Sequence, residues 1–144
     1  MIKTIPDQHI RKAIFDLFNG TIVDGNTINV YDTYYASKGD ELEAYVIMST
    51  QSNDVQYQKC EDFWNSEILL EICTWYGGSA NTGSRLLADQ ILDALRNALE
   101  VDLDLSGGGL EVIRQVITIP NDLTTQLVNG VLFRKFIRLE LRIK

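Results

Sequence analysis

The sequence contains few of the residues from which most enzyme and metal sites are built. It has one histidine, two cysteines and two prolines among 144 residues. The single histidine, His9, would have to serve alone as a general base, so we interpret it as a surface residue at the start of a helix. The residues by themselves therefore predict a non-catalytic domain that needs neither a metal nor a cofactor.

Long apolar runs and an excess of positive charge are also missing. No segment reaches the ~20 apolar residues that cross a bilayer, and Met1–Asp7 contains no apolar signal core. We expect a cytosolic protein whose Cys60 and Cys73 remain thiols, with Cys73 buried in an apolar strand. With 20 acidic and 13 basic residues the net charge is −7, which disfavours nonspecific binding to nucleic acid or to an anionic membrane.

What remains is the composition of an ordinary globular chain. Hydrophobic residues make up 45% and charged residues 23% of the sequence, and we expect residues 1–144 to form one domain. The periodicities predict an α+β fold of order α-β-β-β-β-α-β-β, in which a mostly antiparallel sheet carries both helices on its apolar face. The expected helices cover residues 9–19 and 84–99, and the expected strands cover residues 21–23, 27–31, 44–50, 67–76, 110–119 and 131–143.

Turn and cap residues support several of these boundaries. Asp7 is a candidate N-cap of the first helix, and Gly20 is a candidate left-handed residue after its end. Asp24-Gly25 predicts a hairpin, because a type I′ turn needs positive φ at both central residues. The polar stretches 51–62 and 121–130 are expected to be loops.

Two glycine clusters and one acidic segment come nearest to a catalytic motif. Residues 77–78 precede a helix but lack the lysine and hydroxyl residue of a phosphate-binding loop, so these glycines and those at 107–109 are interpreted as turns. Asp102 and Asp104 alternate on an expected short strand. Paired carboxylates could act as acid and base or hold Mg²⁺. Since no partner base lies nearby, we interpret them as a solvated acidic edge.

The last expected strand carries a row of basic residues. Its apolar side chains alternate with Arg134, Arg138 and Arg142. Six basic minus three acidic residues give +3 for residues 110–144, which leaves −7 − 3 = −10 for the first 109 residues. This asymmetry indicates contact between basic and acidic surfaces of neighbouring copies. A merely solvated strand face and a nucleic-acid contact are the two alternatives.

Six segments of the chain follow one another in a characteristic layout. They form a helix, a hairpin turn, an aromatic-aliphatic strand, a long strand with an aromatic end, a second helix and a basic closing strand, and they are Ile10–Phe18, Asp24-Gly25, Tyr45–Ile47, Leu69–Trp75, Ala88–Leu99 and Phe133–Arg138. This layout resembles that of the small tail-terminator and tail-completion proteins of tailed bacteriophages and prophages. The resemblance covers nearly the whole chain.

The resemblance implies a virion structural protein without catalytic activity. It implies a homo-oligomeric ring, usually a hexamer, at the head–tail junction, assembled in the host bacterial cytoplasm. Such a ring stops growth of the tail tube and offers a docking face to the head connector, so the expected partners are further copies of the chain, the tail-tube protein and a head-completion protein. DNA is expected to pass through an acidic lumen without specific binding, and no membrane is involved.

Two sets of candidate contact residues follow from this interpretation. The candidate subunit interface brings basic and acidic side chains of neighbouring copies together, because a ring joins two different faces of its subunit. It comprises Arg134, Arg138, Arg142, Asp102 and Asp104. The candidate contacts with the tube or connector lie in the two polar stretches, which are suited to ordering on binding. They are Ser52, Asn53, Asp54, Gln56, Asn121, Asp122 and Gln126.

Two other functions remain open at this point. The same α+β unit could form a neck, stopper or connector ring, with twelve subunits and in a short-tailed phage. A small soluble module that binds a metal or another ligand through the acidic edge Glu100–Asp104 is the alternative from another class.

Overall fold

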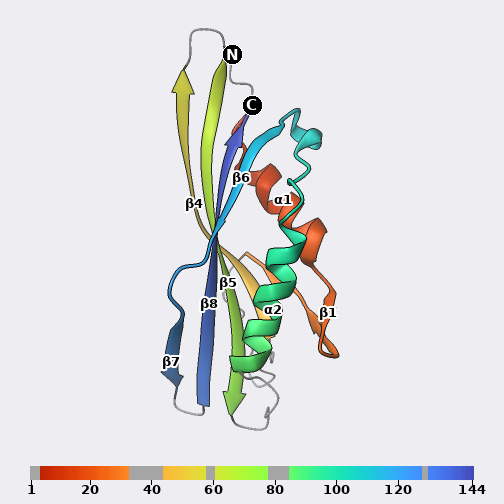
Figure 1. Ribbon diagram of the computed structural model, residues 1–144, viewed down its shortest axis with the longest axis vertical. Helices are drawn as coiled ribbons and strands as arrows, with labels where there is room; N and C mark the ends of the chain where they lie inside the picture. Colours follow the sequence, from red (N-terminus) through yellow and green to blue (C-terminus); the bar gives the residue numbers. More distant parts are fainter. Residues whose placement is uncertain (1–3, 33–43, 58–60, 78–84, 128–129) are drawn as a thin grey trace.

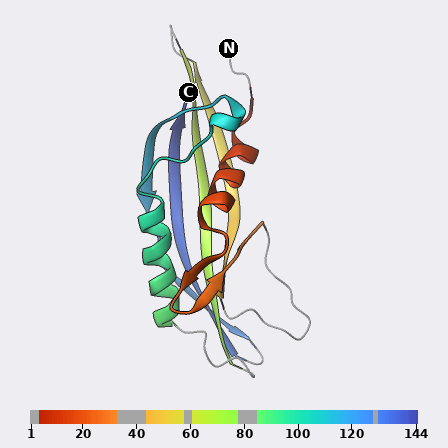
Figure 2. The same cartoon turned by 90° about the vertical axis from the view of Figure 1, so that its right-hand side faces the viewer.

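A long, twisted β-sheet forms the body of the molecule, and both helices lie on one of its faces (Figures 1 and 2). The computed structural model describes residues 4–32, 44–57, 61–77, 85–127 and 130–144. This arrangement confirms the predicted α+β class. In chain order the elements are α1 (Asp7–Phe18), β1 (Thr21–Val23), β2 (Asn26–Ile28), β3 (Val30–Tyr31), β4 (Ala44–Tyr57), β5 (Asp62–Gly77), α2 (Arg85–Ala98), the 3₁₀ helix η1 (Ser106–Gly108), β6 (Val112–Thr118), β7 (Leu123–Leu127) and β8 (Gly130–Ile143).

The main sheet has the strand order β3-β4-β5-β8-β6, with β7 pairing beside β8. β3 and β4 pair in parallel and the other neighbours are antiparallel. β5 and β8 pair from Trp64–Ile143 to Gly77–Gly130 and form the long centre of the sheet. β1 and β2 form a separate two-stranded sheet.

The hydrophobic core lies between the sheet and the two helices. α1 contributes Ile10, Ile14 and Phe18, which are spaced by four residues and are fully buried. α2 contributes the predicted apolar stripe, including Ile91 and Leu95. None of the described helices has the length and apolar character that a membrane crossing requires.

The hairpin and the end of α1 confirm two predicted turns. Asp24 and Gly25 both have positive φ (48° and 77°) between β1 and β2, as a type I′ turn demands. Gly20 has a φ of 81° directly after the helix. The expected cap at the other end of α1 is wrong: Pro6 occupies the N-cap position and Asp7 is the first helical residue.

A β-bulge in β4 changes which side chains face the helices. Met48 pairs with Leu70 and Gln51 with Ile68, so β4 holds one more residue than β5 over this interval. The extra residue places Gln51 and Asn53 on the helix side of the sheet. There, Gln51 Nε2 donates a hydrogen bond to the backbone oxygen of Asp7 (3.3 Å), and Asn53 donates one to the Asp7 carboxylate.

Three expectations about strands and loops are wrong. Residues 51–57, expected in a loop, continue β4 as far as Tyr57. The expected loop 121–130 contains β7, and residues 101–105 form no strand. The polar part of β4 lacks an apolar alternation because its helix-side residues Gln51 and Asn53 bond to the start of α1 instead of packing in the core, and the strand extends past the start of α1 (Figure 1).

The 3₁₀ helix η1 packs against α1, with the ring of His9 lying directly on Gly108. A Cβ added at Gly108 would lie 2.6 Å from His9 Cδ2, whereas one at Gly107 would meet nothing within 4 Å.

We expect Gly108→Ala to lower the free energy of unfolding by about 1–3 kcal/mol, because the imidazole ring must move. Gly107→Ala is the matched control, with an effect within about 0.5 kcal/mol. In urea titrations, the penalty of Gly108→Ala should shrink in the His9→Ala background; an undiminished penalty would contradict the assigned clash.

Candidate subunit-contact surface

The face of the sheet that carries neither helix, here called the helix-free face, holds the basic residues of β8. Arg134, Arg138 and Arg142 all point to it, because they alternate with the core residues of that strand. This confirms the predicted alternation of basic and apolar positions. The face carries equal numbers of acidic and basic residues on its described strands: Asp54, Glu67, Glu71 and Glu140 against Arg114, Arg134, Arg138 and Arg142.

Each arginine of the row contacts the residue two positions beyond its direct partner on β5. Arg138 is paired in register with Leu69, and its Nε lies 2.8 Å from Glu67 Oε1. Arg142 is paired with Asn65, and its guanidinium carbon lies 4.4 Å from the ring centre of Phe63. The sheet twist accounts for this regular diagonal, since it brings diagonal neighbours within reach of long side chains.

Arg134 makes the most buried of these contacts. Glu71 is only 2% exposed, and its carboxylate accepts a hydrogen bond from Arg134 Nε. The pair lies beside a small apolar cluster that includes Ile47 and Cys73. A buried carboxylate depends on such a partner, because burial of an unpaired charge is costly. Arg134 therefore has a structural role within the subunit. A charge reversal at this position is expected to destabilise the fold, so it does not by itself test a subunit contact.

Cys73 is buried, as expected. Burial raises the pKa of the Cys73 thiol well above its ordinary value, and the neighbouring Glu71 carboxylate raises it further. Cys60 lies outside the described residues.

We expect a Cys60→Ser variant to show no reaction with Ellman's reagent at pH 8 in buffer, because the Cys73 thiol is buried and stays protonated. The same variant should react fully in concentrated urea. Rapid labelling of the folded protein would contradict this expectation.

A shallow groove crosses the helix-free face from β4 to β6. It has a volume of about 510 Å³, and most of the residues that line it are polar or charged. Ser52 and Asp54 of β4 line one end, and Arg114 and Val116 of β6 line the other. Arg114 lies directly opposite Arg142 in the register of β6 and β8, so two like charges meet at this end of the groove.

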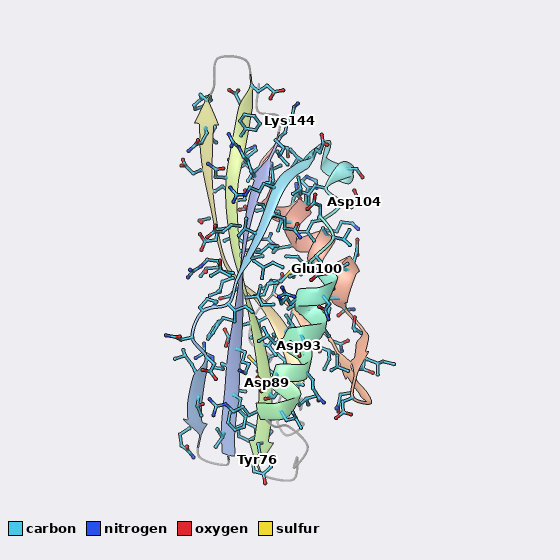
Figure 3. The ribbon with its side chains drawn as sticks, in the orientation of Figure 1. Tyr76, Asp89, Asp93, Glu100, Asp104 and Lys144 are labelled. Carbon is cyan, nitrogen blue, oxygen red and sulfur yellow. The ribbon has the colours of Figure 1, made fainter. Side chains whose placement is uncertain are left out.

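The predicted acidic partners lie elsewhere in the subunit. Asp102 and Asp104 follow α2 and, with Asp16 and Leu17 of α1, line a pocket of about 340 Å³ on the helix side. The side chain and backbone amide of Ser106 donate hydrogen bonds that lower the pKa of Asp104. Figure 3 shows Asp104 in line with the acidic residues of α2 and its end, namely Asp89, Asp93 and Glu100. Contact between the basic row and Asp102 or Asp104 would thus need two copies of the chain.

The candidate tube and connector contacts do not share one loop. Ser52, Asn53, Asp54 and Gln56 lie in strand β4 and not in a loop, which corrects the prediction. Gln126 lies in strand β7, which corrects the prediction that it lies in a loop. Asn121 and Asp122 do lie between strands, as predicted.

Asp122 is held by two basic side chains within the subunit. Arg85 Nη2 lies 2.9 Å and Lys135 Nζ 3.7 Å from Asp122 Oδ2. The hydrogen bond from Arg85 lowers the pKa of Asp122. These contacts tie the start of α2 to the segment that follows β6.

Sequence reasoning did not identify the acidic partners of the basic row. Glu67 and Glu71 are spaced by four residues, as are Arg134 and Arg138. Two acidic residues on one strand and two basic residues on another strand thus have the same spacing. This equal spacing is the signal in the sequence that could have identified them as partners. Across the described parts of the chain, no group of three or more His, Cys, Asp or Glu side chains is arranged to hold a metal ion.

Comparisons with known proteins identify a structural neighbour at low sequence identity. No protein-family model matches the sequence, and neither does any curated protein. A chain from the "Virion of native gene transfer agent (GTA) particle" has a similar structure, with a TM-score of 0.64. The alignment covers 97% of this chain and 99% of that chain at 14% sequence identity. The neighbour therefore shares this fold over its whole length.

Proposed function

We propose that this protein is a structural subunit of a phage-like particle, forming the tail-terminator or tail-completion ring between the tail tube and the head connector. The observation that carries the proposal is the end-to-end structural likeness to a chain of a gene transfer agent virion. The match covers 97% of this chain and 99% of that chain, so the likeness is one of the whole fold. The chain is proposed to act by binding, without catalysis.

The surface chemistry supports a role in assembly. A ring needs two different contact surfaces on each subunit, and the edges of β4 and β6, on opposite sides of this sheet, present different residues to a neighbour. The helix-free face has balanced charge, so a DNA duplex passing along it would meet neither net attraction nor net repulsion.

Electron microscopy of the purified protein with and without tail tubes tests the proposal. We expect discrete rings, or subunits that form a ring only on tube ends, and we expect added protein to stop tube growth. Six subunits per ring support a tail terminator, whereas a twelve-subunit ring that ignores tube ends favours a neck or connector position. A protein that stays monomeric and leaves tube length unchanged would contradict the proposal.

A further inference from the structure

Two strands of the main sheet have a long unpaired edge. Beyond Ile47, β4 has only β5 as a neighbour among the described strands, because β3 pairs with Val46 and Ile47 alone. β6 pairs only with β8, and its other edge has no strand partner in the described chain. Figure 2 shows the two strands on opposite sides of the sheet. Unpaired edges present free backbone N–H and C=O groups that can pair with another chain.

Each of these edges carries one unpaired charge, and the two charges are opposite. Asp54 on β4 and Arg114 on β6 are both exposed and both lie on the helix-free face. Within the described residues neither side chain makes an ion pair, although Glu67, Glu71, Arg134 and Arg138 on the same face do. Arg114 also faces Arg142 directly, so an added carboxylate would relieve that repulsion.

The direction of the strands allows the two edges to join. β4, β5, β8 and β6 alternate in direction, so β4 and β6 run antiparallel to each other. If one copy is placed beside the next by rotation about an axis along the sheet, β4 of the first meets β6 of the second in antiparallel orientation. The helices of both copies then stay on the same side.

From these observations we propose that β4 of one copy pairs with β6 of a second copy, with Asp54 opposite Arg114. This register also places Ser52 opposite Val116 on the helix-free face, and Asn53 opposite Gln115 on the helix side. The contact joins two different edges, so repetition is head-to-tail and gives a ring when the rotation between copies closes, in which each β4 edge is covered by a β6 edge. The inference deepens the proposed function, on which it rests, by naming the surfaces through which the ring closes.

Engineered cysteines test the register. In a Cys60→Ser background, we expect mild oxidation of Ser52→Cys/Val116→Cys to give a ladder of covalent oligomers on a non-reducing gel. Directly opposite antiparallel positions bring the two Cβ atoms to a distance that a disulfide can bridge. The matched control is Gln56→Cys/Val116→Cys, on the same strands and face but displaced by four residues, or about 13 Å. The control should give no ladder.

The charge pair gives a second test that needs no cross-link. Asp54→Arg and Arg114→Asp should each weaken self-association about tenfold, and the double variant Asp54→Arg/Arg114→Asp should restore it. Thermal unfolding of each variant checks that the fold is intact, since both side chains are exposed.

The outcomes separate this inference from the proposed function. Rings seen by native mass spectrometry without a Ser52→Cys/Val116→Cys ladder, or with an equal ladder from the control, overturn the edge contact and leave the proposed function standing. A ladder from a protein that never engages tail tubes overturns the proposed function and leaves the edge contact standing. A protein that stays monomeric, gives no ladder at high concentration or on tube ends, and leaves tube length unchanged overturns both.

Discussion

Replacing Arg134 with methionine is expected to lower the free energy of unfolding by about 3–5 kcal/mol, because it leaves a buried carboxylate without its guanidinium partner. Glu71 is 2% exposed and Arg134 is 23% exposed, so water cannot take over the lost contact fully. A domain of this size has a total stability of about 5–15 kcal/mol. Urea titration followed by circular dichroism should show a clear fall in the transition midpoint.

The paired variant separates a lost ion pair from lost packing. Glu71→Leu/Arg134→Met removes both charges and keeps apolar volume next to Ile47 and Cys73. It should recover most of the loss, because a buried ion pair replaced by apolar side chains is often neutral or stabilising. If the double variant is as unstable as Arg134→Met, the charge on Glu71 is not the cause. Arg138→Met, whose partner Glu67 is half-exposed, is the matched control and should cost less than about 1 kcal/mol.

Truncation of Phe18 to alanine should have an effect of similar size. Phe18 is 1% exposed and is the last residue of α1, packed in the core between the helices and the sheet. Loss of a buried phenylalanine side chain costs about 3–5 kcal/mol, through lost apolar burial and the cavity that remains. Urea titration again measures the loss.

Phe15 provides the control in the same helix. It is 43% exposed, so Phe15→Ala removes a similar side chain without opening a core cavity. We expect an effect below about 1 kcal/mol. Equal penalties at the two positions would mean that the orientation of α1 on the sheet is wrong.

Where an element packs on the core, its sequence pattern was enough to predict it. α2 and β8 have strong apolar periodicities, and their observed bounds lie within one residue of the predicted ones. Asp24-Gly25 predicted its hairpin because few residues accept positive φ twice in succession.

Elements without a core-facing side were missed. The second half of β4 is a strand because β5 supplies its hydrogen bonds. Its side chains contact the start of α1 or solvent. Such a strand needs no hydrophobic alternation, so its polar sequence predicted a loop. The sequence indicated which residues carry the charges of the basic row. It did not indicate their partners, because these depend on the register and twist between β5 and β8, which cannot be read from the sequence of one strand.

The additional residue near Ser49 and Thr50 decides which side chains in the second half of β4 face α1 and which face the opposite side of the sheet. Everything distal to it in β4 is displaced by one position, which exchanges odd and even side chains between the two faces. Removing Thr50 alone would leave one residue opposite Leu69 and keep the pairing of Gln51 with Ile68, so Asn53 would stay toward α1 and Asp54 toward the neighbouring copy. Removing both Ser49 and Thr50, with Met48 still opposite Leu70, would instead place Asn53 opposite Glu67 on the helix-free face and so alter both contacts together.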